Sequence, residues 1–497
     1  MRTVNHWVGG KPVESTSGRY GLVTNPATGE QSARVALADV SEVDNAVAVA
    51  QDALREWRSS SLATRTRILF AYRELLARHR DEIGALITAE HGKVASDAAG
   101  EVARGLEVVE FACGIPQLLK GGYSVGASTG VDVHSIRQPV GVVAGITPFN
   151  FPAMVPLWMF PIAIACGNTF ILKPSEKDPS AALRVAELMA EAGLPDGVLN
   201  VVHGDADAVN RLLEHPDVGA VSFVGSTPVA RHIYRTGTAN GKRVQALGGA
   251  KNHMVVLPDA DLDLAADAAV SAAYGSAGER CMAVSVLVAV GDVGDDLVAR
   301  IKQRVAALRV GPGDDPASEM GPLITREHRD RVAGYVAAGA AEGATVVTDG
   351  RELSVPGHEN GFWLGVSLVD HVRPEMSVYR DEIFGPVLSV VRAPSYEDAL
   401  ALVNDNPWGN GVALFTRDGG VARRFQLEVE AGMVGVNVPI PVPVPYYPFG
   451  GWKASLFGDN HAYGEDGVHF YTRGKVVTTR WPDPATSAVD LGFPQNR

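Results

Sequence analysis

Cysteine is scarce in this sequence: Cys113, Cys166 and Cys281 are the only three among 497 residues. Their number is odd and no two of them are close together, which argues against a disulfide framework and against paired-cysteine metal or redox motifs. We therefore expect no bound metal. Such sparing use of cysteine is typical of a reducing compartment, so we expect a cytoplasmic protein.

Clusters of positive charge are also missing. Lys and Arg number 44 against 57 Asp and Glu, which gives a formal net charge of -13 at pH 7. Without a basic stripe to meet a phosphate backbone, we expect no nucleic-acid partner. Hydrophobic residues make up 46% and charged residues 20% of the chain. These proportions, at this length, predict a globular protein of two or three domains.

A secretory signal and a membrane span are not expected either. Residues 1–7 contain no apolar stretch that would form a signal sequence. The uncharged segment 149–172 is long enough to cross a bilayer, but three prolines and Gly167 interrupt it. We interpret this segment as a buried helix that leads into a strand.

What the sequence does contain is a regular alternation of helical and strand-like patterns. Amphipathic helical stretches cover residues 42–58, 63–91, 180–192, 295–308 and 325–342. Apolar strand-like runs cover residues 140–146, 169–172, 198–202 and 220–223. This alternation predicts an α/β fold with parallel sheets. The series from 139 to 202 is doubly wound, the usual setting for a dinucleotide, although no GxGxxG motif is present and the turn 225-GSTPVA-230 is weak by itself.

Three other stretches are extended. Residues 126–138 alternate like a β-hairpin, and residues 475–481 form a strand-like run near the end of the chain. We interpret both as contacts between subunits. Residues 439–452, PIPVPVPYYPFGGW, hold too many prolines for a helix.

Cys281 lies in a setting that suits a reactive thiol. The sequence around it is 275-GSAGERCMAVS-285, in which small residues predict an accessible turn. The neighbouring Arg280 is expected to favour the thiolate, which is the reactive form. A buried, inert cysteine remains the alternative on this window alone. Cys113 and Cys166 lie in apolar surroundings, and we interpret both as structural.

Six motifs in a fixed order extend this interpretation. They are 147-TPFNFP-152, 171-ILKPSE-176, 223-FVGST-227, 248-GG-249, 278-GERC-281 and 381-DEIFGPV-387. On these motifs the chain is identified as a member of the aldehyde dehydrogenase superfamily along nearly its whole length. The resemblance implies the α/β aldehyde dehydrogenase fold, and a homo-oligomer, either a dimer or a tetramer.

The same resemblance implies three structural parts. A Rossmann-like NAD-binding domain would comprise residues 1–122 and 142–248. An α/β catalytic domain would comprise residues 249–455. A small β oligomerisation element would comprise residues 123–141 and 456–497.

Roles for single residues follow from the resemblance. Cys281 corresponds to the nucleophile that attacks the aldehyde carbonyl, and Asn150 to the amide that stabilises the oxyanion. The residues implied in NAD binding are Phe149, Lys173, Glu176, Ser226, Glu382 and Phe384. A carboxylate at Glu176 would repel a 2′-phosphate, which favours NAD over NADP. Without the resemblance, Asn150 would be interpreted as a turn residue, Glu176 as a surface charge and Phe384 as core packing.

The sequence departs from the family pattern in two places. Ala230 stands where the Gly-rich turn usually ends in glycine, which would narrow the approach to the phosphates. In 244-VQALGGAKNHM-254, Ala246 occupies the position of the glutamate that activates water in typical members, and Lys251 falls one place later than usual. Alanine cannot take a proton, so hydrolysis of a thioester should be slow. An inactive member, a different base or a different acyl acceptor would each explain the change.

A closer resemblance selects the different acceptor. The stretches 104-RGLEVVEFACG-114, 250-AKNH-253, 280-RCMA-283 and 435-GVNVPIPVPVPYYPFGGWKASLFGD-459 are similar to those of methylmalonate-semialdehyde dehydrogenases. These enzymes use NAD and pass the acyl group to coenzyme A, which brings its own thiol. The resemblance implies oxidation of malonate or methylmalonate semialdehyde with loss of carbon dioxide.

Two arginines match the residues that bind the substrate carboxylate in that group, Arg104 and Arg280. An arginine fork can pair with a carboxylate through two hydrogen bonds. By itself, Arg104 would be a charge on a helix surface. Two other functions remain open: oxidation of another acid semialdehyde such as succinate semialdehyde, and a catalytically silent binding protein on the same fold.

Overall fold

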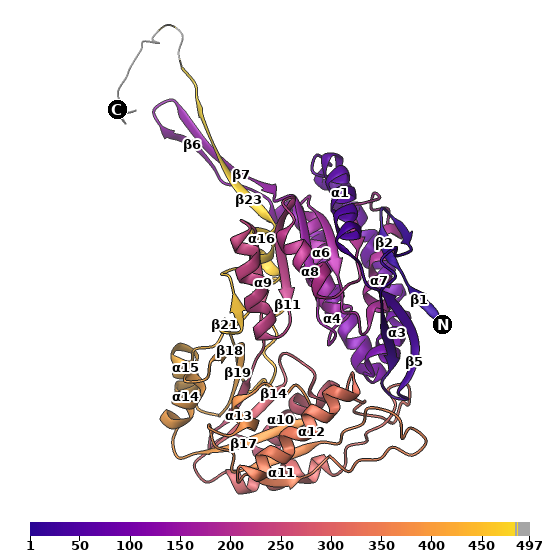
Figure 1. Ribbon diagram of the computed structural model, residues 1–497. Helices are drawn as coiled ribbons and strands as arrows, with labels where there is room; N and C mark the ends of the chain where they lie inside the picture. Colours follow the sequence, from indigo (N-terminus) through magenta and orange to yellow (C-terminus); the bar gives the residue numbers. More distant parts are fainter. Residues whose placement is uncertain (483–484, 486–497) are drawn as a thin grey trace.

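The structure, a computed structural model, describes residues 1–482 and residue 485. It confirms the α/β fold that the alternating pattern predicts: two large sheets flanked by helices, and a narrow arm (Figure 1). The end of the predicted segment 456–497 lies outside the described residues, at 483–484 and 486–497.

The first sheet has eight strands, of which the five central ones run parallel. In spatial order they are β22 (Leu456–Phe457), β12 (Arg243–Leu247), β11 (Val218–Val224), β8 (Val142–Ile146), β9 (Thr169–Lys173), β10 (Leu199–Val201), β2 (His6–Val8) and β3 (Lys11–Val13). The four predicted strands are β8, β9, β10 and β11. Because β8 and β11 are neighbours although β9 and β10 lie between them in the chain, the strand order reverses between them.

Helices cover both faces of the first sheet. Val142, Ala144 and Ile146 of β8 pack on one face, and Val143 packs on the other, as alternation along a strand requires. One face carries α1 (Val40–Trp57), α8 (Ala206–Glu214) and α9 (Thr227–Ala239). The other carries α2 (Leu62–Arg78), α3 (Arg80–His91), α4 (Ala95–Cys113), α6 (Met154–Ala165) and α7 (Pro179–Glu191).

α6 is the buried helix expected within 149–172. It is 12 residues long, and all of its residues are buried. Across the described residues, no helix has the length and apolar character needed to cross a membrane.

The single helix predicted for 63–91 is in fact two helices. α2 ends and α3 begins at His79, whose φ of -97° and ψ of 12° leave the helical region. Asp81 and Glu82 lie in the first turn of α3, where acidic side chains favour a helix start, and Glu82 contacts Nδ1 of His79 at 2.5 Å. The apolar periodicity continues across this break, which is why the pattern alone predicts one helix.

The second sheet has seven strands, of which six run parallel. Their order is β15 (Thr345–Thr348), β16 (Ser367–Asp370), β17 (Val387–Ala393), β14 (Val284–Val290), β13 (Asn252–Val256), β19 (Gly411–Phe415) and β20 (Met433–Val436). The helices that pack with it are α10 (Leu262–Tyr274), α11 (Gly294–Val305), α12 (Arg326–Ala341), α13 (Ser377–Arg380), α14 (Tyr396–Asn404) and α15 (Gly419–Glu428). The chain enters this sheet from β12 through residues 248–251, next to the domain boundary predicted at 248/249.

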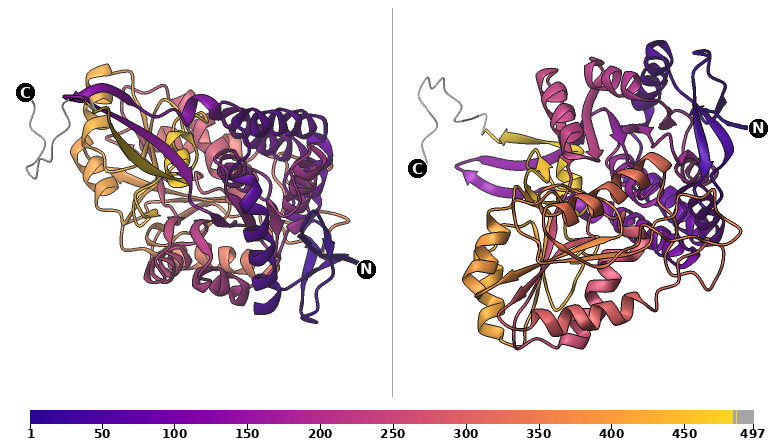
Figure 2. Two further views of the ribbon diagram at one scale, coloured as in Figure 1. Left: turned by 90° about the horizontal axis from the view of Figure 1, so that it is seen from above. Right: turned by 60° about the horizontal axis from the view of Figure 1, so that its bottom comes forward.

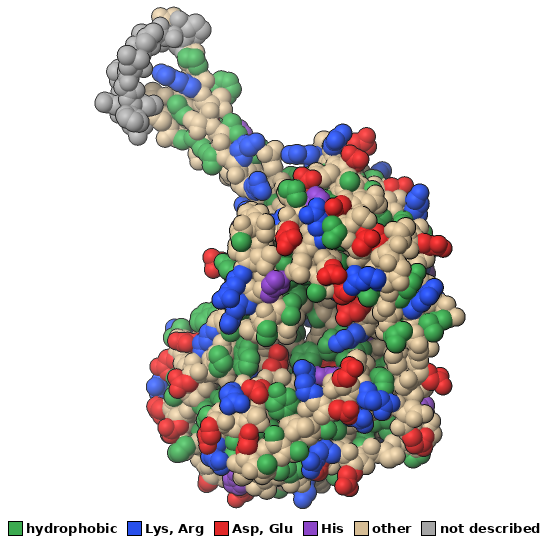
Figure 3. Space-filling view, viewed as in Figure 1, with side chains coloured by type: hydrophobic (Ala, Val, Ile, Leu, Met, Phe, Trp, Pro, Cys, Tyr) green, Lys and Arg blue, Asp and Glu red, His purple; other side chains and the backbone are tan. Residues whose placement is uncertain are grey.

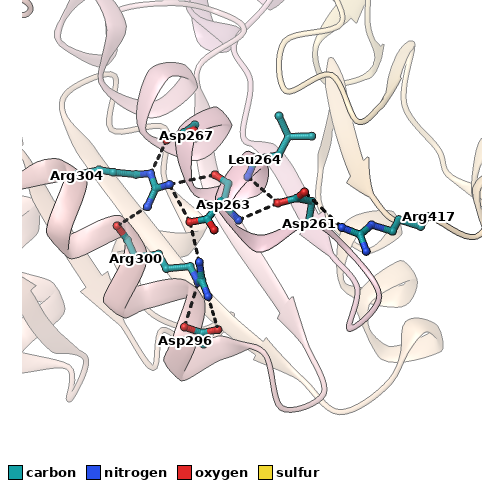
Figure 4. Close-up of polar contacts among 8 residues, drawn as sticks. All are labelled: Asp261, Asp263, Leu264, Asp267, Asp296, Arg300, Arg304 and Arg417. Carbon is teal, nitrogen blue, oxygen red and sulfur yellow. Dashed lines mark hydrogen bonds and ion pairs between the residues drawn. The ribbon is translucent and has the colours of Figure 1, made fainter.

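Polar contacts fix the start of α10, the helix that leads into the Cys281 loop (Figure 4). Asp261 caps α10 by accepting hydrogen bonds from backbone N–H groups of its first turn. Arg300 and Arg304 of α11 pair with Asp263 at 2.7 and 3.1 Å. Because exposed ion pairs stabilise little one by one, the buried packing between the two helices holds them together.

A narrow three-stranded sheet forms the arm that stands away from both large sheets (Figure 1, Figure 2). It contains the predicted hairpin, β6 (Tyr123–Ser128) and β7 (Val131–Pro139), with the predicted terminal strand β23 (Thr472–Arg480) paired along β7. Val125 is 80% exposed and Val476 69% exposed on this arm.

The segment before β23 belongs to the body of the molecule. β22 pairs with β12 in the first sheet, and α16 (Gly464–Phe470) packs against α6. Phe470 and Tyr471 are buried in the core beside α6. Residues 456–471 therefore lie apart from the arm, although the predicted oligomerisation element includes them, because their apolar side chains complete that core.

The remaining elements are short. They are a sheet of β1 (Arg2–Val4), β5 (Glu30–Ala36) and β4 (Tyr20–Asn25), a pair of β18 (Trp408–Gly409) and β21 (Trp452–Lys453), the helix α5 (Ile115–Leu118), and the 3-10 turn η1 (Gly275–Gly278). As expected, the Pro-rich stretch 439–452 forms no helix.

Candidate active site

The predicted site residues gather where the two large sheets face each other. Figure 3 shows the molecule hollowed between the part built on the first sheet and the part built on the second. On the first sheet, the strand order reverses between β8 and β11. At such a reversal, α/β sheets bind ligands in the crevice at the carboxyl ends of the strands. Asn150 follows β8 and Ser226 follows β11 at this edge. On the second sheet, Cys281 precedes β14.

The Cys281 loop is held in a tight, unusual conformation. Ser276 and Ala277 have φ values of 51° and 52°, in the left-handed region that L-residues rarely adopt. Gly278 also has positive φ, and a Cβ there would lie 2.2 Å from the carbonyl oxygen of Gly385. The loop therefore packs directly on the segment that carries Phe384.

Two asparagines fix the backbone of the cysteine itself. The carbonyl oxygen of Cys281 accepts hydrogen bonds from Nδ2 of Asn252 at 2.8 Å and from Nδ2 of Asn410 at 3.2 Å. Neither asparagine was predicted to have a role. Asn252 lies inside the quoted stretch 250-AKNH-253, but Asn410 carried no signal that could have found it.

Cys281 lines one cavity together with Glu382 and Phe384. The thiol is only partly accessible, and burial raises its pKa to about 12, with the Glu382 carboxylate adding to the rise. The prediction that Arg280 favours the thiolate is not supported. Nη2 of Arg280 donates instead to Oδ1 of Asp97 at 2.6 Å, because its side chain turns toward the start of α4.

Asn150 is buried in the loop that follows β8. Its carbonyl oxygen accepts a hydrogen bond from Nζ of Lys93 at 2.6 Å, whereas its side-chain amide makes no hydrogen bond with the residues that the structure describes. That amide is free to donate to an oxyanion. Lys93 was not predicted to have a role.

The residues predicted to hold the adenosine half of a dinucleotide lie at the crevice. Nζ of Lys173, at the end of β9, is 3.3 Å from Oε2 of Glu176. Ser226 is the N-cap residue of α9, yet its side chain makes no capping hydrogen bond, so the hydroxyl and the free N–H groups of the first turn remain available for an anion. Ala230 is fully buried in the core against the sheet, so its methyl group is part of that packing.

The residues predicted for the nicotinamide half are tied to the second sheet. Oε1 of Glu382 accepts a hydrogen bond from the backbone N–H of Ala250 at 2.9 Å. Gly249 permits this approach, since a Cβ there would lie 2.2 Å from Oε2 of Glu382. Phe384 has a φ of 59°, and its ring meets that of Phe149 edge to face with centroids 5.9 Å apart.

Lys251 supports the segment before Glu382. Its buried Nζ donates to the carbonyl oxygens of Val378 and Asp381 at 2.8 and 2.7 Å. Burial lowers the pKa of Lys251 to about 7, while the Glu382 carboxylate acts in the opposite direction. Lys251, which lies one place later in the chain than in typical members, therefore holds the end of α13 in place.

Ala246 provides no acid–base group. It pairs with Phe223 and Phe457 across β12, and its side chain is fully buried in the apolar core on the α9 side of the sheet. The glutamate position of typical relatives is therefore filled by an alkyl group packed against other apolar side chains.

A buried acid that the sequence analysis missed lies two residues before Cys281. Glu279 has no solvent exposure, and its carboxylate oxygens lie 3.7 Å from Nε2 of His91 and 3.4 Å from Nε2 of His328. Arg331 donates to Nδ1 of His328, so Nε2 of that ring carries the proton and donates to the carbonyl oxygen of Phe384 at 2.7 Å. This cluster supports the strained backbone at Phe384.

The two predicted substrate arginines line different cavities. Arg280 lines the cavity of Cys281. Arg104 lines a neighbouring one with Trp158 and Tyr463, where Nη2 donates to the carbonyl oxygen of Pro443 at 2.9 Å and Nη1 contacts Glu107 at 2.5 Å. The Pro-rich stretch thus forms a wall of the Arg104 cavity.

Comparison with known proteins agrees with this arrangement. Residues 13–477 match the Aldehyde dehydrogenase family. The malonate-semialdehyde dehydrogenase of Pseudomonas aeruginosa is 57% identical over 496 residues, which cover 99% of this chain and 100% of the relative.

Solved structures of two relatives also match nearly the whole chain. One is a Sinorhizobium meliloti 1021 protein assigned as a methylmalonate-semialdehyde dehydrogenase, in complex with NAD, with a TM-score of 0.97, 52% identity, and coverage of 98% of this chain and 99% of that chain. Another is the methylmalonate-semialdehyde dehydrogenase of Oceanimonas doudoroffii, with a TM-score of 0.96, 56% identity and the same coverage. The resemblance drawn from the six motifs is confirmed.

Proposed function

Because the chain belongs to the aldehyde dehydrogenase family, we propose that it oxidises malonate or methylmalonate semialdehyde with NAD and transfers the acyl group to coenzyme A. The products are acetyl-CoA or propionyl-CoA, carbon dioxide and NADH. The observation that carries this proposal is 57% identity, over the whole chain, to a malonate-semialdehyde dehydrogenase.

Cys281 and Asn150 perform the first step in this proposal. The sulfur of Cys281 attacks the aldehyde carbon, and the free amide of Asn150 donates to the developing oxyanion together with the backbone N–H of Cys281. NAD supplies the hydride acceptor for the oxidation. The protein is left with an acyl thioester on Cys281.

Coenzyme A then takes the acyl group because the protein offers no base at Ala246. The fully buried alanine side chain cannot activate water for hydrolysis. A thiol co-substrate replaces water as the nucleophile, and Cys281 leaves as the thiol. The buried packing of Ala246 supports this choice of acceptor.

The crevice residues fit NAD. Lys173 and Glu176 lie together at the end of β9, where they would hold the adenosine ribose hydroxyls, and Ser226 at the start of α9 would face the pyrophosphate. Glu382 would hold the nicotinamide ribose, with Phe149 and Phe384 beside the ring. The carboxylate of Glu176 disfavours a 2′-phosphate, so we propose NAD rather than NADP.

The substrate carboxylate calls for a cation near Cys281. Arg280 lines the Cys281 cavity, and its guanidinium would exchange Asp97 for the substrate carboxylate. Arg104 lines the adjacent cavity and is partly exposed. We propose that both arginines bind the carboxylate.

The proposed roles of the three structural parts follow the two large sheets and the arm. We propose that residues 1–122 and 142–248 bind NAD, that residues 249–455 form the catalytic domain, and that the arm, with 123–141, assembles the chain into a homo-oligomer, a dimer or a homotetramer. The exposed Val125 and Val476 support the last assignment, since apolar side chains on a free sheet favour burial by a partner. The three free cysteines suit a reducing cytoplasm.

The test measures NADH formation from methylmalonate semialdehyde with and without coenzyme A. With it, we expect steady turnover and an acyl-CoA product. Without it, we expect a burst of about one NADH per active site followed by a slow rate, because only deacylation needs the acceptor. Equal steady rates in both cases, with the free acid as product, would refute the proposal. A panel that includes succinate semialdehyde separates the alternative substrates.

A further inference from the structure

A buried ammonium group lies directly behind the Asn150 loop. Lys93 follows the end of α3 and is 1% exposed. Its Nζ lies 2.6 Å from the carbonyl oxygen of Asn150 and 2.5 Å from Oε2 of Glu101 on α4. The same Nζ lies 3.9 Å from the centroid of the Phe151 ring. Among the described residues, the hydrogen bonds, ion pair and ring contact of this cation all go to the loop between β8 and α6 or to the acid that also holds that loop.

The second carboxylate oxygen of Glu101 also binds the loop between β8 and α6. Oε1 accepts hydrogen bonds from the backbone N–H groups of Ala153 and Met154, at 2.9 and 3.1 Å. These N–H groups open α6, where a carboxylate is favoured. Lys93 thus holds the carbonyl side of the loop and Glu101 its N–H side, with both side chains fully buried.

We propose that Lys93 and Glu101 are positioning residues that set the side-chain amide of Asn150 toward the oxyanion formed at Cys281. The inference rests on the proposed role of Asn150. A buried ion pair is often no more stabilising than an apolar pair of the same size, so stability alone does not explain its placement here. Fixing both sides of the seven-residue loop that carries the free amide of Asn150 does explain it. The charge of Lys93 also lowers the pKa of Cys281, which acts in the direction that the reaction needs.

The test compares Lys93→Met with wild type in the NADH burst with methylmalonate semialdehyde. Loss of a charge-assisted hydrogen bond predicts a burst rate constant lower by about 10- to 100-fold, with the Kd for NAD changed less than about twofold. Lys302→Met, an exposed lysine on α11 that forms no ion pair among the described residues, is the matched control and should keep the wild-type burst.

A double-mutant cycle with Asn150→Ala separates positioning from general damage. If Lys93 acts through Asn150, Lys93→Met should slow the burst of the Asn150→Ala protein less than about twofold further. Independent, multiplicative losses would overturn the inference. Should Lys93→Met fail to fold, Glu101→Gln enters the same cycle, since it keeps the shape of the side chain and weakens the pair.

Two further outcomes are distinct. A wild-type protein that forms no NADH from any semialdehyde refutes the proposed function, and the inference with it. A wild-type protein with the expected burst, whose Lys93→Met form retains that burst within twofold, refutes the inference alone.

Discussion

Oε1 of Glu279 lies 3.4 Å from Nε2 of His328, inside a cluster that solvent does not reach. Burial raises the pKa of Glu279 to about 8 and lowers that of His328 to about 4. His91, on the other side of the carboxyl group, also has a pKa well below its ordinary value because of burial. The cluster is therefore neutral at neutral pH, with the proton on the acid.

This assignment predicts how stability depends on pH. Between its ordinary pKa near 4.5 and the folded value near 8, Glu279 binds more protons in the folded state than in the unfolded state, so its contribution to stability falls as pH rises through that window. Glu279→Gln removes this loss. The melting temperature of the variant relative to wild type should rise from pH 6 to pH 8, by the equivalent of about 1.4 kcal/mol per pH unit, and then level off.

Measuring the difference between the two proteins is necessary because Lys251 acts in the opposite direction over part of the same range. Its folded pKa of about 7 lies below its ordinary value, so its own contribution recovers as pH rises. A gap between variant and wild type that stays constant from pH 6 to pH 9 would show that Glu279 is ionised in the folded protein.

Cys281→Ala should abolish turnover and the NADH burst while NAD binding survives. The thiol forms the covalent intermediate, whereas the residues proposed for NAD lie on other elements. Steady-state NADH formation and NAD titration measure the two properties separately. Cys113→Ala is the matched control, since that buried cysteine lies at the end of α4 and outside the Cys281 cavity. Turnover of Cys281→Ala within tenfold of wild type would contradict the assignment.

Arg104→Leu and Arg280→Leu should each raise the KM for methylmalonate semialdehyde far more than for propanal, which has no carboxylate. A lost charge-assisted contact corresponds to about 10- to 150-fold. Arg280→Leu carries an additional expectation, because it leaves the Asp97 carboxylate, which lines a different cavity from Cys281, without its arginine partner. Arg280→Leu combined with Asp97→Asn should recover stability but not the KM. Equal effects on both aldehydes would make the arginines structural.

Glu176→Ser should improve the relative use of NADP. The carboxylate is 40% exposed beside Lys173, and removing it leaves a cation that can meet a 2′-phosphate. We expect the ratio of kcat/KM for NAD over NADP to fall by at least about tenfold. A wild-type protein that already prefers NADP would contradict the assignment of this pair.

The sequence predicts the strands around the crevice because each is a short apolar run at the right spacing, as β8 and β9 show. It does not predict the break at His79, since the apolar periodicity of α2 continues into α3. The sequence also suggests a wrong partner for Arg280. Arg280 is next to Cys281 in the chain, but its guanidinium pairs with Asp97 and not with the thiol.

Supporting contacts across long sequence separations are the part that a single sequence hides. Asn410 reaches the Cys281 carbonyl from 129 positions away, and Lys93 reaches that of Asn150 from 57 positions away. Neither residue type predicts such a buried contact, because asparagine and lysine are ordinarily surface residues. The order of strands within the second sheet brings Asn410, before β19, to Cys281, before β14. The packing of α3 and α4 on the first sheet brings Lys93 to the loop after β8.

Burial disfavours the thiolate form of all three cysteines. The pKa is about 11 for Cys113, about 12 for Cys166 and about 12 for Cys281, in each case because burial disfavours the charged form. Peroxides and alkylating agents attack the thiolate, and this form is scarce at pH 7 for thiols with such pKa values. We therefore expect Cys281, the proposed nucleophile, to react slowly with peroxides while no substrate is bound, so that an oxidising episode would spare the cysteine on which turnover depends.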